Sequence, residues 1–468
     1  MENTPKVKQL LENIKNCAEA DTLKNLVPVA ETFPLLSSTD KLAITKGFYD
    51  WALVNTTTGS LKFPVAIYLS GLADFFTDNY ESSLAKMNEA LKLFEELHNN
   101  DGISICIFMI GPIYRTLGNI DLGLKTLWEG YELLKKSGMF PHYIMAASFQ
   151  IASIFSERNN YDEAISLFNE TLEMAKKVSN KIFVINAWQG LGKIYVAQKE
   201  FDKAKQSFDT ALSVAKEVGA PMFLSNIHTE IANYHFVSEN YEESEKYNTL
   251  ALEERLQQKL LAAAITNQLQ LSEIYRKQHK PDEAIALVLK GLELAEQVKL
   301  KPKMSQLHKK LSELYEAKND SEKSLHHYKL FHQIQEQVEH EDAAKKIKNL
   351  RLLFEAEQTK KENIIIKQQK AEIEQKNIEL QDTIDELTLA KVSKKAKALT
   401  LIVAIILFII IDIFLEVVLH MLPKDNLLLT LATKIVIIFS LKPIETGVEH
   451  YLLKKIMKRK KELAAEAA

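Results

Sequence analysis

The side chains with the most distinctive chemistry lie in apolar sequence near the C-terminus. Asp412, Glu416 and His420 follow one another at steps of four residues, which places them on one face of a helix. A charge at membrane depth costs about 2.5 to 3.5 kcal/mol, so such a group normally faces a partner or a polar cavity. Lys434, in the next apolar run, lies at a depth similar to that of Asp412 if the chain turns near Pro423. We expect an ion pair between them that stabilises a helical hairpin; a proton or ion site and a contact with another membrane protein are the alternatives.

The apolar runs themselves predict two membrane-spanning helices. Residues 398–421 form a run long enough to cross a bilayer, and residues 427–447 form a second, shorter run. Lysines precede the first run and recur in the tail, residues 448–468, whereas the turn carries one lysine beside an aspartate. This asymmetry predicts a multi-pass protein of the inner (cell) membrane with both termini in the cytoplasm, and a tail that contacts anionic lipid. The N-terminal sequence lacks the pattern of a signal peptide, which agrees with this topology.

Motifs for catalysis or cofactor binding are absent from the sequence. It contains no phosphate-binding glycine loop, no HExxH zinc helix, no nucleophile elbow and no kinase motif set. Cys17 and Cys106 lack metal-ligand spacing and are expected to be reduced thiols. A formal net charge of -3 at pH 7 provides no global field to attract nucleic acid. We therefore expect no enzymatic activity, no cofactor, no metal and no nucleic-acid partner.

The rest of the chain is organised by helical periodicity. With 46% hydrophobic residues but only 14 glycines and 11 prolines, the composition predicts an all-α fold with few complex loops. In residues 181–220, small and apolar side chains recur at helical spacing on two successive helices: Trp188, Leu191, Gly192 and Tyr195, then Ala204, Phe208 and Ala211. This arrangement resembles the tetratricopeptide repeat (TPR), in which two helices pack face to face. The resemblance implies a superhelical solenoid, because one repeat cannot bury its apolar face alone.

Copies of this pattern recur on both sides at steps of about 40 residues. The residue that opens the second helix of each repeat is, in order, Tyr80, Ile120, Tyr161, Phe201, Tyr241, Pro281 and Ser321. We infer seven repeats over residues 61–338, with longer helices or longer turns than the usual repeat of about 34 residues. Residues 1–60 predict further helices that cap the first repeat.

The resemblance also implies a binding surface. In the repeat family the first helices line a concave groove that recognises an extended peptide or a partner protein. The side chains expected to point into this groove are Arg115, Phe149, Gln189, Lys193, Asn226, Asn233, Glu273 and Arg276. The amides and Lys193 in this set could hold a ligand's backbone or a carboxylate. An unoccupied, solvated face is the alternative, and a full lysine and asparagine clamp for a terminal carboxylate is not evident.

Between the repeats and the apolar runs, residues 339–397 predict a long polar helix. An apolar line repeats every seven residues through Ile366, Ile373, Leu380 and Leu387. Asn377 lies at the complementary seam position, where a buried asparagine favours two parallel helices in register. A parallel homodimer is therefore predicted, and a single solvated helix is the alternative.

Together these elements predict a membrane-anchored, cytoplasm-facing TPR scaffold or adaptor that binds other proteins. The order of repeats, helical rod and membrane spans also resembles bacterial repeat-containing sensor kinases, although their phosphoacceptor and ATP-binding domains are absent from this sequence. A signal-sensing protein without a catalytic domain is the second hypothesis. An intramembrane ion or proton site in the hairpin is the third.

Overall fold

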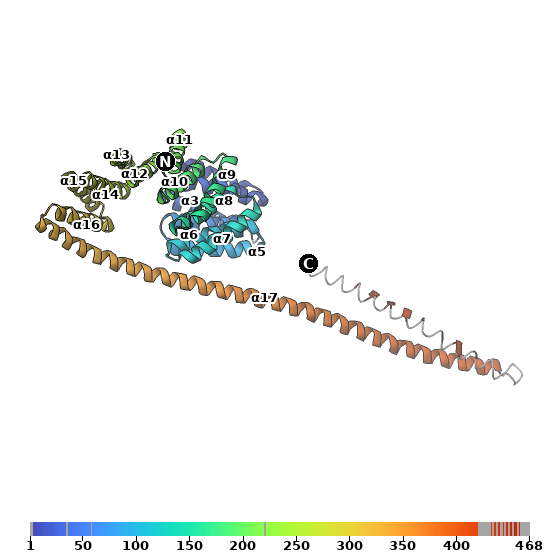
Figure 1. Ribbon diagram of the computed structural model, residues 1–468. Coiled ribbons are helices and arrows are strands. Elements are labelled where there is room, and N and C mark those ends of the chain that lie inside the picture. The colour runs from blue at the N-terminus through green and yellow to red at the C-terminus, as the bar shows by residue number, and fades with distance from the viewer. Residues whose placement is uncertain are drawn as a thin grey trace. The chain divides into compact units, whose positions relative to one another are not determined.

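The protein is helical throughout the part of the chain that the structure describes. The computed structural model describes residues 3–33, 36–57, 59–219 and 221–419, with isolated positions between 432 and 458. Every regular element in these ranges is a helix, which confirms the predicted all-α class (Figure 1). The chain divides into two compact units, Met1–Glu355 and Ala356–Ala468.

The first compact unit contains a series of paired antiparallel helices. The first helices of the pairs are α4 (Lys62–Phe76), α6 (Asn100–Thr116), α8 (Pro141–Glu157), α10 (Lys181–Ala197), α12 (Pro221–Val237), α14 (Leu261–Lys277) and α16 (Lys301–Ala317). The second helices are α5 (Tyr80–Glu96), α7 (Ile120–Ser137), α9 (Tyr161–Lys177), α11 (Phe201–Val218), α13 (Tyr241–Gln257), α15 (Pro281–Gln297) and the start of α17 (Ser321–Leu419). Each of the seven residues that the sequence places at the start of a second helix is the first residue of one of these helices.

Helix length accounts for the long repeat period. Both helices of a typical pair, such as α8 and α9, have 17 residues. The turns that join them are short and share one backbone conformation. Lys199 has a φ of 62°, and the next N–H, that of Glu200, donates to the carbonyl of Tyr195 at 2.8 Å. This capping bond ends α10 abruptly and lets α11 return antiparallel to it.

Small residues allow the two helices of a repeat to cross closely. A Cβ atom added at Gly192 would lie 2.5 Å from Cε1 of Phe208 on the paired helix. At Gly111 it would lie 2.6 Å from Cγ of Leu127. The large side chain of the second helix therefore occupies the space that the glycine leaves free. The same pairing of a glycine with a large side chain occurs in both of these repeats.

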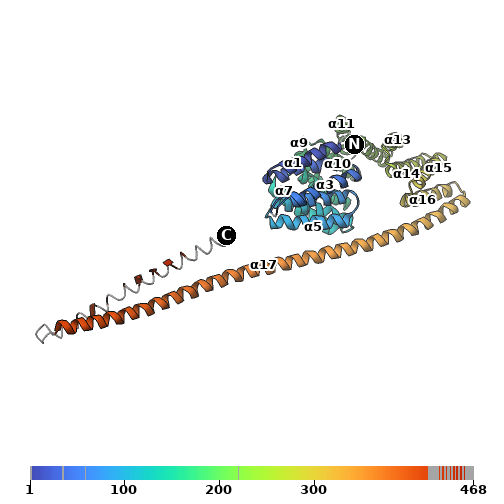
Figure 2. The same cartoon turned by 180° about the vertical axis from the view of Figure 1, so that it is seen from behind.

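Three helices and a short 3-10 turn precede the first repeat: α1 (Asn3–Asn16), η1 (Glu19–Asp21), α2 (Thr22–Thr32) and α3 (Ser38–Asn55). Both α2 and α3 contact α4, and α1 and α3 are visible from behind in Figure 2. The carboxylate of Glu19 accepts hydrogen bonds from Ser60 Oγ and Leu61 N, each at 2.8 Å. Lys62 Nζ donates to the backbone carbonyls of Lys15 and Cys17 at 2.9 and 2.8 Å. These bonds connect the N-terminal helices to the start of α4, the first helix of the first repeat.

The second compact unit contains the later part of α17. One helix in the described residues, Ser321–Phe414, is long and apolar enough to cross a membrane, judged by length and composition, and its apolar stretch is exposed in the structure. His420, Lys434 and most of the second predicted span, residues 427–447, lie outside the described residues. The predicted hairpin therefore stays a prediction.

Candidate functional site

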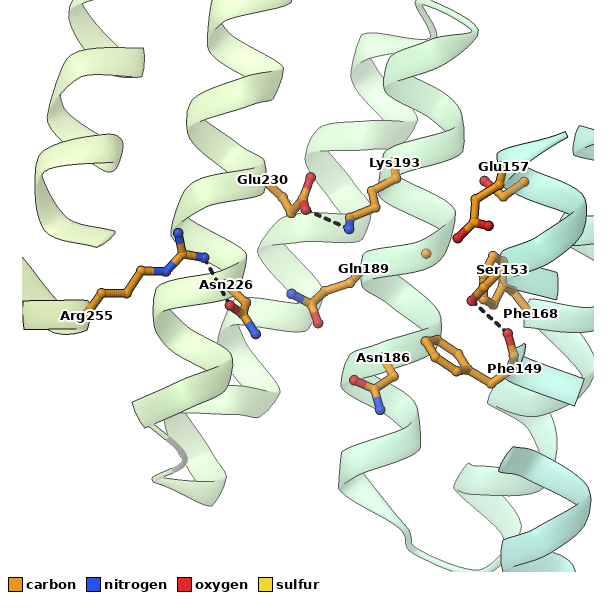
Figure 3. Close-up of a pocket in the computed structure, with 12 residues that line it drawn as sticks. Phe149, Ser153, Glu157, Phe168, Asn186, Gln189, Lys193, Asn226, Glu230 and Arg255 are labelled. Carbon is orange, nitrogen blue, oxygen red and sulfur yellow. Dashed lines mark hydrogen bonds and ion pairs between the residues drawn. The ribbon is translucent and has the colours of Figure 1, made fainter. Parts of the chain in front are cut away.

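The first helices of successive repeats lie side by side along one face of the array. α8 contacts α10, and α10 contacts α12. Their side chains surround a pocket of about 440 Å³, here named the central pocket, to which α9 adds Phe168 and α13 adds Arg255 (Figure 3). Half of the predicted groove residues line this pocket, namely Phe149, Gln189, Lys193 and Asn226.

Two amides on α10 are the groups in the central pocket best suited to hold a ligand. Asn186 and Gln189 lie about one helical turn apart, and among the described residues neither side chain has a hydrogen-bond partner. An amide both donates and accepts, so it can match the N–H and C=O groups of an extended peptide. The sequence prediction omits Asn186, although its spacing of three residues from Gln189 places it on the same helix face and could have identified it.

Three charged side chains at the central pocket, Glu157, Lys193 and Glu230, are paired across neighbouring helices. Lys193 Nζ lies 2.7 Å from Glu230 Oε1, so the lysine that is predicted to meet a ligand is engaged by α12. Arg115 Nη2 lies 2.5 Å from Glu157 Oε1 on α8. Because each pair joins residues about one repeat apart, helical spacing within one element could not reveal the acidic partners.

A smaller pocket of about 130 Å³ lies farther along the array, between α12, α13 and α14, and includes Asn233 and Glu273. Glu273 forms ion pairs with Arg276 and, at 2.5 Å, with Lys310 of the next repeat. The hydrogen bond from Arg276, joined by that from Lys310, lowers the pKa of Glu273 to about 2. Glu273 therefore ties α14 to α16 through Lys310, and Arg276 pairs with it within α14. Asn233 keeps an exposed amide beside this pocket.

The predicted intramembrane residues are only partly within the described structure. Asp412 and Glu416 lie on α17 and are exposed. His420 and Lys434 lie outside the described residues, so the ion pair remains a prediction. Within the described ranges, no group of three or more His, Cys, Asp or Glu side chains could hold a metal ion.

Comparison with known proteins supports the type of repeat. Residues 143–217, which cover α9, α10 and most of α8 and α11, match the family model of the tetratricopeptide repeat. These residues are tetratricopeptide repeats. The array around them, built from the same helix pairs, is a TPR-like solenoid, as predicted.

Solved structures to which this chain is similar include two bacterial proteins. The apo form of the quorum sensor NprR from B. thuringiensis is 15% identical, with a TM-score of 0.53 over 70% of this chain and 91% of NprR. Aspartyl phosphate phosphatase F from Bacillus subtilis is 13% identical, with a TM-score of 0.46 over 71% of this chain and 94% of that one. At these identities the NprR likeness shows the TPR-like fold alone. No curated protein matches this chain in sequence.

Proposed function

We propose that this protein is an adaptor whose central pocket binds an extended peptide segment, either free or part of a partner protein. A TPR-like solenoid is typical of proteins that mediate protein-protein interaction, and this is the general basis of the proposal. The observation that carries it is the pair of amides, Asn186 and Gln189, which line the central pocket and have no partner among the described residues.

The side chains of the central pocket offer the contacts that a peptide needs. The ring of Phe149 lies in the wall of the pocket and offers an apolar contact for a side chain. The amides of α10 offer both donors and acceptors to a backbone. The ion pair between Lys193 and Glu230 holds its two side chains in place before a ligand arrives, which reduces the entropy cost of binding. NprR, whose fold is similar, is described as a quorum sensor.

A photo-crosslinking experiment tests this proposal. A photoreactive residue at Gln189 in the full chain should form a covalent product with a peptide or protein in cells. The matched control is Gln206, an exposed glutamine on α11. Replacing Asn186 with Ala should reduce the product formed from Gln189 by about tenfold, because one polar contact to a ligand is lost. Equal labelling from Gln189 and Gln206, or no product from Gln189, would refute a ligand in the central pocket.

We further propose that α17 anchors the array to a membrane and pairs with a second copy. The exposed apolar stretch of α17 supports the anchor, because a soluble protein normally buries a continuous surface of this kind. Ile373, Leu380 and Leu387 are 58%, 58% and 65% exposed, which leaves their heptad line available for a second helix. The multi-pass topology, with both termini in the cytoplasm, is part of this proposal. A reporter enzyme that is active only after export should stay inactive when fused to either terminus.

A signal-sensing role is the second candidate. α17 runs as one helix from the last repeat into the apolar stretch. Its first turns are part of the array, because Ser324 Oγ donates to the carbonyl of Ser312 on α16 at 3.1 Å and the His327 ring lies against His308. A ligand that changes the packing of the last repeats would act directly on the helix that enters the proposed membrane segment. If crosslinking from Gln189 captures a small secreted peptide rather than a larger protein, the sensor is favoured over the scaffold.

A further inference from the structure

One second-helix residue breaks the pattern of the array. Arg255 on α13 occupies the place that neighbouring repeats give to a small residue, namely Ala175, Ala215 and Ala295, all of them 0% exposed. Arg255 is itself only 8% exposed. The fifth repeat therefore buries a guanidinium group where the third, fourth and sixth repeats bury a methyl group.

The side chains around this arginine are polar as well. Asn248, which is 2% exposed, stands where the preceding repeat has the core ring of Phe208. Asn267 is fully buried and stands where the following repeat has Leu307. Burying polar groups in place of apolar ones costs stability unless they are hydrogen-bonded. A change at several positions that meet in space points to a function for the polar cluster.

Hydrogen bonds hold the guanidinium at the edge of the central pocket. Arg255 Nη2 donates to Asn226 Oδ1 at 3.1 Å, and Nη1 donates to the carbonyl of Ala263 at 3.3 Å and to Asn267 Oδ1. Asn267 Nδ2 in turn donates to Asn248 Oδ1. Arg255 Nε is buried and has no acceptor among the residues that the structure describes. The network orients the arginine, but all its acceptors are neutral oxygen atoms.

The positive charge has no carboxylate partner in the described part of the chain. Glu230 is paired with Lys193 at 2.7 Å, and Glu254 is paired with His228 at 3.0 Å, while no ion pair of Arg255 is found among the described residues. Burial accordingly lowers the pKa of Arg255, and the more distant Glu230 and Glu254 only partly oppose this effect. A buried charge without a partner is strongly unfavourable, so the site is suited to receive a negative group.

We propose that Arg255, with Asn226 and Gln189, forms an anion subsite that binds a carboxylate of the peptide in the central pocket. All three residues line that pocket, and Figure 3 shows the guanidinium beside Asn226 with the Gln189 amide directed toward them. The carboxylate accepts hydrogen bonds from Arg255 and from the two amides, which gives charge-assisted bonds to a group that is already oriented. Its source is the peptide's C-terminus or an Asp or Glu side chain. This inference rests on the proposed peptide-binding function.

The test uses the full chain in detergent and two pools of random N-acetylated heptapeptides, one with free C-termini and one amidated. The protein and the peptides bound to it are separated from unbound peptides by size, and the bound peptides are identified by mass spectrometry. If the C-terminus is bound, amidation should lower retention by about tenfold or more, the effect of losing a hydrogen bond to a charged group. If a side chain is bound, amidated peptides should still be retained and should be enriched in Asp or Glu at one position.

A substitution at Arg255 tests the anion subsite separately from peptide binding in the central pocket. Arg255→Met should abolish the preference for carboxylates while neutral peptides are still retained. Arg158→Met is the control, because this arginine pairs with Asp121 and does not line the central pocket. A preference that persists in Arg255→Met would overturn the subsite but leave the peptide groove. If the unaltered protein retains no peptide from either pool, the proposed function fails and the subsite fails with it.

A second variant keeps the test decisive if Arg255→Met does not fold. Asn226→Asp places a permanent carboxylate where the present amide oxygen lies 3.1 Å from Arg255 Nη2. It should raise the melting temperature and at the same time weaken the retention of carboxylate peptides, because the subsite is then occupied from within. A damaging substitution would lower both quantities. An unchanged or lower melting temperature with an undiminished carboxylate preference would overturn the proposal.

Discussion

Replacing Gly192 with alanine tests the close packing on which the solenoid depends. The added Cβ would lie 2.5 Å from Cε1 of Phe208, and Phe208 is only 1% exposed, so its ring has little room to move. Overpacking of this kind costs about 1 to 3 kcal/mol. Alanine also favours a helix over glycine by about 1 kcal/mol. We expect a net loss of about 0 to 2 kcal/mol in the free energy of unfolding.

A control glycine isolates the packing effect. Gly47 on α3 has no atom within 4 Å of an added Cβ, so Gly47→Ala should gain the helix preference alone, about 0.5 to 1 kcal/mol. The two substitutions should thus differ by about 1 to 3 kcal/mol. Hydrogen exchange measured by mass spectrometry on peptides from α10 and α11 reports this local stability, since repeat arrays need not unfold in one step.

A second substitution makes the test of packing specific. Phe208→Leu removes the ring that the alanine at position 192 would meet, so the double variant should be less destabilised than the sum of the two single variants. If Gly192→Ala stabilises α10 and α11 as much as Gly47→Ala stabilises α3, the close crossing is not what maintains this repeat. A coupling energy near zero between positions 192 and 208 would lead to the same conclusion.

Three further predictions address the membrane segment, the pairing of α17 and the response to pH. Lys434→Leu should impair accumulation in the membrane, and adding Asp412→Leu should restore it; a double variant as impaired as the single one would refute the ion pair. Cysteines at Ile373 or Leu380 should crosslink two copies in membranes, and failure at both positions with normal expression would favour a single helix. Burial lowers the pKa of His308 from 6.5 to about 4, so the folded state binds fewer protons than the unfolded state, and stability should fall as the pH drops from about 6.5 towards 4. His308→Gln should flatten that part of the pH profile of the melting temperature, and an unchanged profile would show that other groups cause it.

The fold could be predicted in detail because the repeat pattern combines several local signals. Small residues such as Gly192, large partners such as Phe208 and an opening residue such as Phe201 each recur at one position of the repeat. The residue type at each of these positions is set by steric contacts with neighbours in the same helix pair. Counting from one well-matched repeat therefore located the first residue of every second helix from Tyr80 to Ser321.

The candidate site was less predictable, because its important partners come from different repeats. The expectation that first helices line the groove places Gln189, Lys193 and Asn226 on the groove face. In the structure, all three line the central pocket. That assumption could not include Arg255, since second helices are expected to face away from the groove. The sequence does contain a signal for Arg255, because this arginine stands at a repeat position that holds alanine in the third, fourth and sixth repeats.

The helical class, the repeat register and the apolar stretch can be predicted from the chain alone, because each follows from the periodicity of side-chain size and polarity. Which charges are neutralised could be learned only from the folded molecule. Lys193 meets Glu230 of the next repeat, whereas Arg255 meets only neutral oxygen atoms among the described residues. Pairing of charges depends on distances of a few ångströms between separate helices, and the stacking of the repeats sets those distances.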